Sequence, residues 1–404
     1  MKEPLLYLCH RIPYPPNKGD KIAAFNILKY LSKHYDVFLG CFIDDPFDKQ
    51  YIEDVKKFCV DCSILNLSPT FSKIKSIRAF TTGEAQSVPY YSNRKMSQWV
   101  SRTLTTNNIS KAFVFSSSMA QFVEDHNELQ KRVIHFVDID SDKWLQYSKR
   151  TKGIMRSIYR REYLMLARYE KKIAAKFDIS CFVTAAETSM FQKMVNEETA
   201  RKVFPLENGI DCEFFSKKSN VNLSESYDLS NQNYVVFTGA MDYWANVDAV
   251  KWFIDNTWPT VLNVIPDAQF YIVGSSPTKQ VLQLTKNQGV TVTGRVEDVR
   301  PYLLHSKAAV APMQIARGIQ NKILEAMSME CHVITTELGI EGIDNYPSPQ
   351  VTVTASPDMM AQWVIDKLSA PHQHASRSRQ WLLDNYSWNA KLSPLIDFLD
   401  NNHA

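Results

Sequence analysis

The residues with the clearest chemical signal lie between two short apolar runs, residues 308–311 and 332–336. These runs predict buried strands, so the polar segment between them opens a helix of a strand-helix-strand unit. Lys322 stands at the predicted helix start, where unpaired amides and the helix dipole disfavour a cation. We therefore expect an anion there, such as a nucleotide diphosphate, although a solvated surface lysine is the alternative. The residues expected to bind it are Gly318, Ile319, Gln320, Asn321, Lys322 and Glu325.

A second candidate loop, residues 13–20, follows the first predicted strand. Its prolines exclude a helix, and Gly19 lets the backbone approach a ligand before the next helix begins. A stiff connecting loop that binds nothing accounts for the same residues equally well.

Two carboxylates, Asp138 and Asp140, follow the predicted strand 133–137. Residues at the carboxyl end of a parallel strand face the ligand crevice, so either could orient or deprotonate a hydroxyl group. The spacing resembles the start of a calcium loop, but Lys143 and Lys149 stand where that loop needs glycine and glutamate. A solvated or helix-capping acidic loop remains an alternative.

Gly239 follows the predicted strand 234–238 and lets a phosphate or a sugar come close to the backbone. We expect Asn246 to cap the helix that follows. A plain strand-loop-helix junction is the alternative, but the layout repeats that of the segment around Gly318.

A further strand, residues 290–293, ends at Gly294. The backbone of Arg295 and Val296 is placed to contact a base edge while the Arg295 side chain faces phosphate. The alternative, which is compatible with this role, is that Asp298 caps the next helix.

A basic stretch with interleaved apolar residues occupies the middle of the chain. Such a pattern suits a helix that lies against an anionic membrane surface or lipid phosphates. An ordinary solvated, charged helix explains it equally well. The basic residues are Lys149, Arg150, Lys152, Arg156, Arg160, Arg161, Arg168, Lys171 and Lys172.

Composition limits the class of protein. A chain of 404 residues predicts two domains of roughly 200 residues each. A net charge of +3 and the lack of a stacking motif argue against nucleic acid. Seven scattered cysteines indicate free thiols in a reducing cytoplasm, and no apolar run reaches membrane-spanning length. The motifs of P-loop proteins, serine hydrolases and zincins are absent.

Strand-like runs alternate with helical patterns along the whole sequence, which predicts an α/β protein with parallel sheets. A polar stretch places the domain boundary near residues 206–230. Residues 381–399 have apolar side chains at helical spacing and predict one helix. The strand-like runs are residues 5–9, 37–42, 112–115, 133–137, 179–184, 234–238, 268–273, 290–293, 308–311 and 332–336.

These segments together resemble glycosyltransferase family 4, whose members are retaining enzymes with the GT-B fold. The match is closer to the sugar transferases associated with PEP-CTERM and exosortase exopolysaccharide systems. The segments that carry the resemblance are residues 10–21, 136–144, 208–211, 238–244 and 316–322.

The resemblance implies two Rossmann-like domains with parallel sheets facing across a cleft: residues 1–207 on the acceptor side and residues 208–384 on the nucleotide-sugar side. A C-terminal helix of about residues 385–404 would pack back on the first domain. The reaction implied is transfer of a sugar from a nucleotide-diphosphate donor to a lipid-linked saccharide acceptor, with no metal and no cofactor. Glu325 would bind the ribose hydroxyls, and Gly19 would approach the diphosphate.

Two departures from the family pattern bear on the chemistry. Arg317 stands eight residues before Glu325, where the family has a carboxylate that contacts the donor sugar. Gly239 is followed by Ala240 and Met241 rather than by a basic pair. We hypothesise that Arg317, Lys322 and Arg295 supply the missing charge. A nucleotide-sugar epimerase of the same fold and a non-catalytic nucleotide-sugar-binding subunit are the alternatives.

Overall fold

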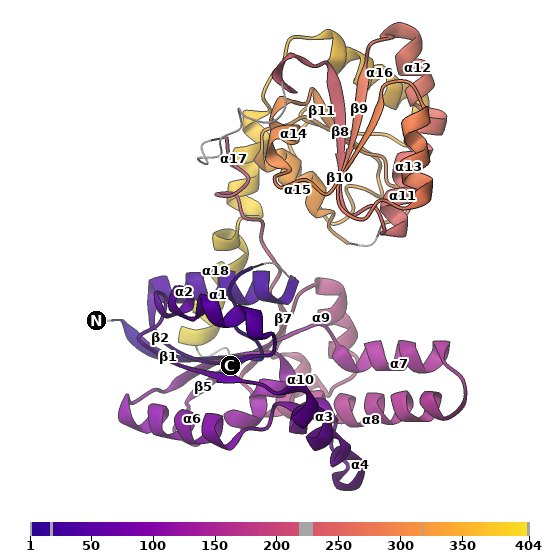
Figure 1. Ribbon diagram of the computed structural model, residues 1–404. Coiled ribbons are helices and arrows are strands. Elements are labelled where there is room, and N and C mark those ends of the chain that lie inside the picture. The colour runs from indigo at the N-terminus through magenta and orange to yellow at the C-terminus, as the bar shows by residue number, and fades with distance from the viewer. Residues whose placement is uncertain (1, 17–18, 218–228, 317, 402–404) are drawn as a thin grey trace. The chain divides into compact units, whose positions relative to one another are not determined.

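Two parallel β-sheets organise the chain (Figure 1). The computed structural model describes residues 2–16, 19–217, 229–316 and 318–401. One unit comprises Met1–Asn208 with Lys391–Ala404, and the other comprises Gly209–Ala390. The predicted α/β class with two Rossmann-like parallel sheets is confirmed. No helix in the described ranges is both long enough and apolar enough to cross a bilayer.

The sheet of the first unit has the order β3-β2-β1-β4-β5-β6-β7. Its central strands are buried along most of their length, because helices cover both faces of a parallel sheet. The strands are β1 (Glu3–Cys9), β2 (Tyr35–Ile43), β3 (Asp61–Asn66), β4 (Lys111–Phe115), β5 (Lys131–Val137), β6 (Ile179–Phe182) and β7 (Val203–Pro205).

Helices of the first unit connect these strands. The longest, α8, forms an antiparallel pair with α7 (Figure 1). The helices are α1 (Gly19–His34), α2 (Ile52–Lys56), α3 (Pro69–Ile77), α4 (Ala79–Thr82), α5 (Ser87–Tyr91), α6 (Arg94–Thr106), α7 (Asp140–Arg150), α8 (Gly153–Lys176), α9 (Ala185–Gln192) and α10 (Glu197–Ala200).

The sheet of the second unit has the order β10-β9-β8-β11-β12-β13. Neighbouring residues of β8 point to opposite faces: Val235 and Phe237 join one apolar core, while Tyr234 and Val236 join the other. The strands are β8 (Tyr234–Thr238), β9 (Gln269–Val273), β10 (Val290–Gly294), β11 (Ala308–Ala311), β12 (Val333–Thr335) and β13 (Val351–Val353).

Both sheets reverse their strand order beside the first strand of the unit, between β1 and β4 and between β8 and β11. Open α/β sheets bind ligands at the carboxyl ends of the strands next to such a reversal. The helices of the second unit are α11 (Trp244–Asn256), α12 (Trp258–Val264), α13 (Lys279–Gln283), α14 (Arg300–His305), α15 (Asn321–Ser328), α16 (Pro357–Ser369) and α17 (Ser376–Asn385).

The C-terminal segment is not the single helix predicted for residues 381–399. It forms α17 and then α18 (Trp388–Asp400), with a break where Ser387 makes a bridge to Ile210. Residues of α18 from Lys391 onward belong to the first unit. There the Asp400 carboxylate accepts hydrogen bonds from the Tyr35 hydroxyl (2.6 Å) and the Lys111 ammonium (2.7 Å).

Candidate functional site

Three glycines form the carboxyl edge of the second sheet. Gly239 follows β8, Gly274 follows β9 and Gly294 ends β10, with φ values of 152°, 159° and 70°. A Cβ on Gly274 would lie 1.7 Å from the Gly239 carbonyl oxygen, so no other residue fits there. The Gly239 amide donates to the Val273 carbonyl (3.0 Å), which fixes the first of these loops against the next strand. The edge therefore presents backbone rather than side chains to a ligand.

Lys322, in the first turn of α15, lies directly beside this edge. A Cβ on Gly239 would be 3.4 Å from the Lys322 Cε atom. The Lys322 ammonium donates to the Gln320 side-chain oxygen (3.2 Å) and lies 5.4 Å from the centre of the Phe237 ring. Burial lowers the pKa of Lys322 to about 8, with the nearby Glu325 opposing the shift. Lys322 is therefore half-buried and partly desolvated, which argues against the alternative of a fully solvated surface lysine.

Glu325 lies one turn further along α15, on the same side of the helix as Lys322. Burial raises the pKa of its carboxyl group to about 7, and the charge of Lys322 opposes the shift. The two side chains form no direct ion pair, and the Glu325 carboxylate accepts no hydrogen bond from another side chain that the structure describes. Lys322 and Glu325 are thus both partly desolvated and lie on the same side of the helix. The cation can bind an anionic group, and the carboxylate can accept hydrogen bonds from hydroxyl groups.

Asn246 is buried against Gly239 and does not cap α11. That helix begins two residues earlier, at Trp244, and its N-cap residue Tyr243 makes no side-chain capping bond. Instead, the Asn246 amide nitrogen donates to the Ala240 carbonyl (2.9 Å) and holds the loop after β8. Its buried side-chain oxygen has no partner among the described residues. The capping prediction is wrong because the helix starts before Asn246.

The loop after β10 places Arg295 in solvent and Val296 half-buried against the core. The Asp298 carboxylate accepts from the amide of Arg300, the first residue of α14 (2.9 Å), and pairs with the Arg300 guanidinium (2.7 Å). Asp298 therefore supports the helix start, although the N-cap position itself is Val299. Arg295 remains an exposed cation next to Gly294.

The segment before α15 is arranged as an open loop. Gly318 has a φ of 66° and is exposed, with no atom near the position of a Cβ. Ile319 packs towards Gly342, Gln320 is the N-cap residue without a side-chain capping bond, and Asn321 is exposed at the first position of the helix. The amides of the first turn are therefore not taken by a capping side chain. Arg317 lies outside the described residues.

In the first unit, the predicted carboxylates Asp138 and Asp140 lie together around one lysine. The Lys143 ammonium is 2.6 Å from an Asp138 oxygen and 3.0 Å from an Asp140 oxygen. Burial opposes it, but the two carboxylates raise the pKa of Lys143. Asp140 is the first residue of α7, and the N-cap residue is Ile139. Lys143 thus holds the two carboxylates in place, and their oxygens can accept further hydrogen bonds.

The residue directly before Asp138 has a strained backbone conformation. Val137 ends β5 with a φ of 74°, a conformation that β-branched residues rarely adopt. Its amide donates to His135 Nδ1 (2.9 Å), so His135 Nε2 donates in turn to the Leu206 carbonyl (3.0 Å). Burial lowers the pKa of His135 to about 4, which keeps the ring neutral and this arrangement intact. Strain of this kind, held by surrounding bonds, is common at functional sites.

Glu187 is a further carboxylate at this edge, and the sequence analysis missed it. Burial, and then the charge of Asp138, raise its pKa to about 7. It accepts from the Ile139 amide (3.3 Å), and its own amide donates to the Thr184 hydroxyl (3.1 Å). The signal was present, since Thr184 and Glu187 have the spacing of a capping box directly after a strand. Gly274, which was also missed, follows its strand just as Gly239 does.

Gly19, the first residue of α1, is exposed and has open space where a Cβ would be. Next to it, the Asp20 carboxylate accepts from Arg11 (2.9 Å) and lies 3.3 Å from His10. The hydrogen bond from His10, together with the charges of His10 and Arg11, lowers the pKa of Asp20 well below its usual range. Arg11 also pairs with Asp44 (2.8 Å). The charges around Gly19 are therefore already compensated.

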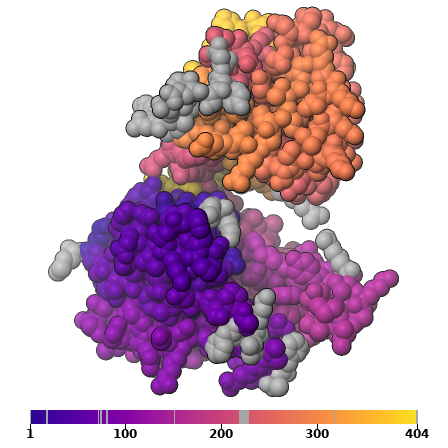
Figure 2. All heavy atoms as spheres, viewed as in Figure 1, coloured from indigo at the N-terminus to yellow at the C-terminus, as the bar shows by residue number. Residues whose placement is uncertain are grey.

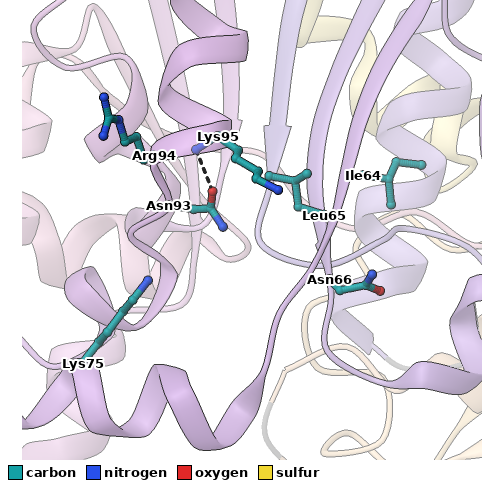
Figure 3. Close-up of a pocket in the computed structure, with 7 residues that line it drawn as sticks. All are labelled: Ile64, Leu65, Asn66, Lys75, Asn93, Arg94 and Lys95. Carbon is teal, nitrogen blue, oxygen red and sulfur yellow. Dashed lines mark hydrogen bonds between the residues drawn. The ribbon is translucent and has the colours of Figure 1, made fainter.

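A separate basic pocket of about 420 Å³ lies at the carboxyl end of β3 (Figure 3). Three cations from two helices line it, and no carboxylate does. Asn93 caps α6 by accepting from the Lys95 amide (2.9 Å), and the Lys75 ammonium donates to the Ser92 carbonyl (3.0 Å). Such a lining favours an anionic ligand. The lining residues are Ile64, Leu65, Asn66, Lys75, Asn93, Arg94 and Lys95.

Comparison with known proteins identifies a family match for part of the second unit and solved structures with a similar fold. Residues 232–369, within the second unit, match the family model of glycosyl transferases group 1. The fold is similar to that of HepE from Anabaena, solved in complex with UDP, over 99% of both chains with 12% identity and a TM-score of 0.60. It is also similar to that of sucrose-phosphate synthase from Thermosynechococcus elongatus, over 98% of this chain and 97% of that chain, with 14% identity and a TM-score of 0.61.

A third solved neighbour is WaaG, a glycosyltransferase involved in lipopolysaccharide biosynthesis. The similarity covers 98% of this chain and 100% of that chain, with 15% identity and a TM-score of 0.52. In sequence, the chain is 20% identical over 393 residues to an uncharacterized 44.6 kDa protein in the cps region of Klebsiella pneumoniae, covering 93% of this chain and 94% of the relative. Together, the family match and the fold support a glycosyltransferase of the GT-B type.

Proposed function

We propose that this protein transfers a sugar from a nucleotide-diphosphate donor to a saccharide acceptor. The observation that carries the proposal is Lys322, a desolvated lysine with a lowered pKa beside the Gly239 backbone and the open first turn of α15. A half-buried cation without a carboxylate in contact is costly, and a bound diphosphate offsets that cost.

The donor would bind at the glycine edge of the second sheet. Amides of residues 319–322 and the Lys322 ammonium contact the diphosphate, while Arg295 approaches it from the loop after β10. Glu325 accepts hydrogen bonds from the ribose hydroxyls. The UDP and UDP-glucose bound to HepE are consistent with a nucleotide sugar as the ligand. We propose that Arg317 helps to supply the positive charge that the basic pair after Gly239 would provide in the family. We also propose that the Gly19 backbone approaches the diphosphate.

The acceptor would be held by the first unit. Asp138 and Asp140, fixed by Lys143, accept a hydrogen bond from the attacking hydroxyl and orient it. Glu187, whose pKa burial raises to about 7, would accept the proton of the attacking hydroxyl. Catalysis is then electrostatic: fixed donors and cations stabilise the leaving diphosphate as the hydroxyl attacks. Retention of configuration, and a reaction without metal or cofactor, follow from the resemblance to glycosyltransferase family 4.

We further propose a lipid-linked acceptor and a role in exopolysaccharide synthesis at the inner face of the cytoplasmic membrane. The basic pocket at β3 supports a phosphate-bearing acceptor, because three cations and no carboxylate are among its lining residues. The cps-region relative supports the polysaccharide role. The PEP-CTERM association rests on the sequence resemblance alone.

The decisive experiment measures release of free nucleotide from a panel of nucleotide sugars, with and without saccharide acceptors. A transferase releases nucleotide only when an acceptor is present, and the product anomer, assigned by NMR, reports retention. Isomerisation of the donor without an acceptor would instead identify an epimerase. Binding of a donor with no turnover under any acceptor would identify a non-catalytic subunit.

A further inference from the structure

The α7–α8 hairpin concentrates positive charge at one end. Residues 143–161 contain seven basic residues and no acidic residue. The two helices are joined by a short turn at Thr151 and Lys152, so both helix ends come together there. Figure 2 shows this part of the first unit projecting outward. A surface of one sign at the end of a projecting element is suited to a ligand surface of the opposite sign.

Four cations near the turn differ from two at the other end of α8 in having no ion-pair partner among the described residues. Lys172 and Lys176 contact the Glu124 carboxylate at 2.6 and 3.2 Å. By contrast, four exposed cations near the turn form no ion pair with any residue in the described ranges. They are Lys149, Lys152, Arg156 and Arg160.

Apolar side chains are exposed among these free cations. Ile154 is 78% exposed, and Met155 beside it is 39% exposed. Tyr147, across the turn, is 52% exposed and packs edge-on against Trp144, with ring centres 5.9 Å apart. Tyr159 closes this aromatic group from α8, 5.5 Å from Trp144. Apolar tips with aromatic and basic neighbours are characteristic of segments that lie in a membrane interface.

We propose that the end of the α7–α8 hairpin docks on an anionic lipid bilayer, with Ile154 and Met155 in the headgroup region. Charge complementarity selects the occupant, since an apolar protein partner would leave the four cations unpaired. The biological role of this docking rests on the proposed function. Asp138 directly precedes α7, whose 11 residues span about 16 Å. Docking of the hairpin end would therefore hold Asp138 close to a lipid-linked acceptor.

The test is co-sedimentation of the protein with vesicles of phosphatidylcholine and phosphatidylglycerol, compared with vesicles of phosphatidylcholine alone. The wild-type protein should bind the anionic vesicles, and added salt should weaken binding. Lys152→Glu with Arg156→Glu should lower the partition coefficient by about tenfold or more. Ile154→Ser should lower it by about threefold, because one apolar side chain no longer enters the interface.

The second unit offers a matched control. Lys279 and Lys286 are exposed cations that flank Leu282, which is 49% exposed. Lys279→Glu with Lys286→Glu makes the same change in net charge, and Leu282→Ser removes a similar apolar group. Neither should change vesicle binding.

Equal loss of binding in the hairpin and control variants would overturn the proposal, because net charge alone would then explain it. Binding of the hairpin variants at the wild-type level, or no binding of the wild type to anionic vesicles, would also overturn it. None of these measurements needs turnover, so a failure here is separate from a failure of the proposed transferase activity, which nucleotide release in solution reports.

Discussion

Both sheets have the strand order that places a ligand at the carboxyl ends of their central strands, but the two edges are built from different groups. In the second unit the edge consists of glycine backbone, with a desolvated Lys322 that has no carboxylate in contact. In the first unit the carboxylates that follow β1 and β5 already have cationic partners, as Asp20 has Arg11 and Asp138 has Lys143. The comparison indicates that the glycine edge of the second unit needs an anion, whereas the Asp138 and Lys143 pair after β5 is complete without one and is suited to a neutral hydroxyl.

The largest effect should come from Gly274→Ala. The new Cβ would meet the Gly239 carbonyl, and a φ of 159° is unfavourable for alanine. Strain and overpacking together should cost about 3 kcal/mol or more, and nucleotide binding should be lost with the loop geometry. Thermal melting and nucleotide titration measure the two effects.

Gly318→Ala is the control for this prediction. It also has a positive φ, but there is open space at the Cβ position. Its cost should be about 1 kcal/mol. Equal effects of the two substitutions would mean that close packing of the glycine edge does not matter.

Lys322→Met should separate binding from stability. Losing a charge-assisted contact to a diphosphate should weaken nucleotide affinity by about tenfold to a hundredfold. Removing a desolvated ammonium should raise the melting temperature of the ligand-free protein, because its pKa is lowered by burial. Lys279→Met, an exposed lysine of the same unit, should change neither quantity. A lower melting temperature in Lys322→Met would show that the lysine serves the fold rather than a ligand.

Nucleotide affinity should pass through a maximum between about pH 7 and pH 8. Glu325 accepts ribose hydroxyls best when ionised, so affinity rises as pH passes its pKa of about 7. Lys322 attracts diphosphate only when protonated, so affinity falls as pH rises through its pKa of about 8. Calorimetric titrations over this range measure the profile. Glu325→Gln should remove the acidic limb and Lys322→Arg the alkaline limb; an unchanged limb in either variant would contradict its assignment.

The smallest effect on stability should come from Lys143→Met in the first unit. Its side chain is 48% exposed, and exposed ion pairs contribute about 0.2–1 kcal/mol. Nucleotide affinity should stay at the wild-type value, while acceptor-dependent nucleotide release should slow because Asp138 loses its positioning partner. Lys171→Met, an exposed lysine of α8 without an ion pair to another described residue, is the control. A loss of nucleotide affinity in Lys143→Met would break the division of roles between the two edges.

The strands of the two sheet centres were predictable from sequence because they are buried on both faces. The apolar runs at residues 234–238 and 308–311 coincide with β8 and β11. The strand β3 was missed because none of its residues is fully buried, and β7 and β13 were missed because each has only three residues.

The candidate site was predictable where a residue type carries its own signal, and unpredictable where tertiary contacts create the property. Gly239 and Lys322 stand out by type and position, and the structure brings them together. The pKa of Glu187 and the strain at Val137 depend on burial and on His135, which no local spacing reveals. Asn246 was misassigned because α11 begins two residues earlier, at Trp244. Asn246 therefore lies inside the helix, where its side chain donates to the carbonyl of Ala240 in the loop after β8.

The most direct test of the central claim is a thermal-shift panel of nucleoside diphosphates and nucleotide sugars on the wild-type protein and on Lys322→Met. A ligand that binds only the folded state raises its melting temperature. At least one nucleotide diphosphate should stabilise the wild type and shift Lys322→Met much less, while Lys279→Met responds as the wild type does. No shift with any member of the panel, or equal shifts in wild type and Lys322→Met, would contradict the assignment of this edge to the donor diphosphate.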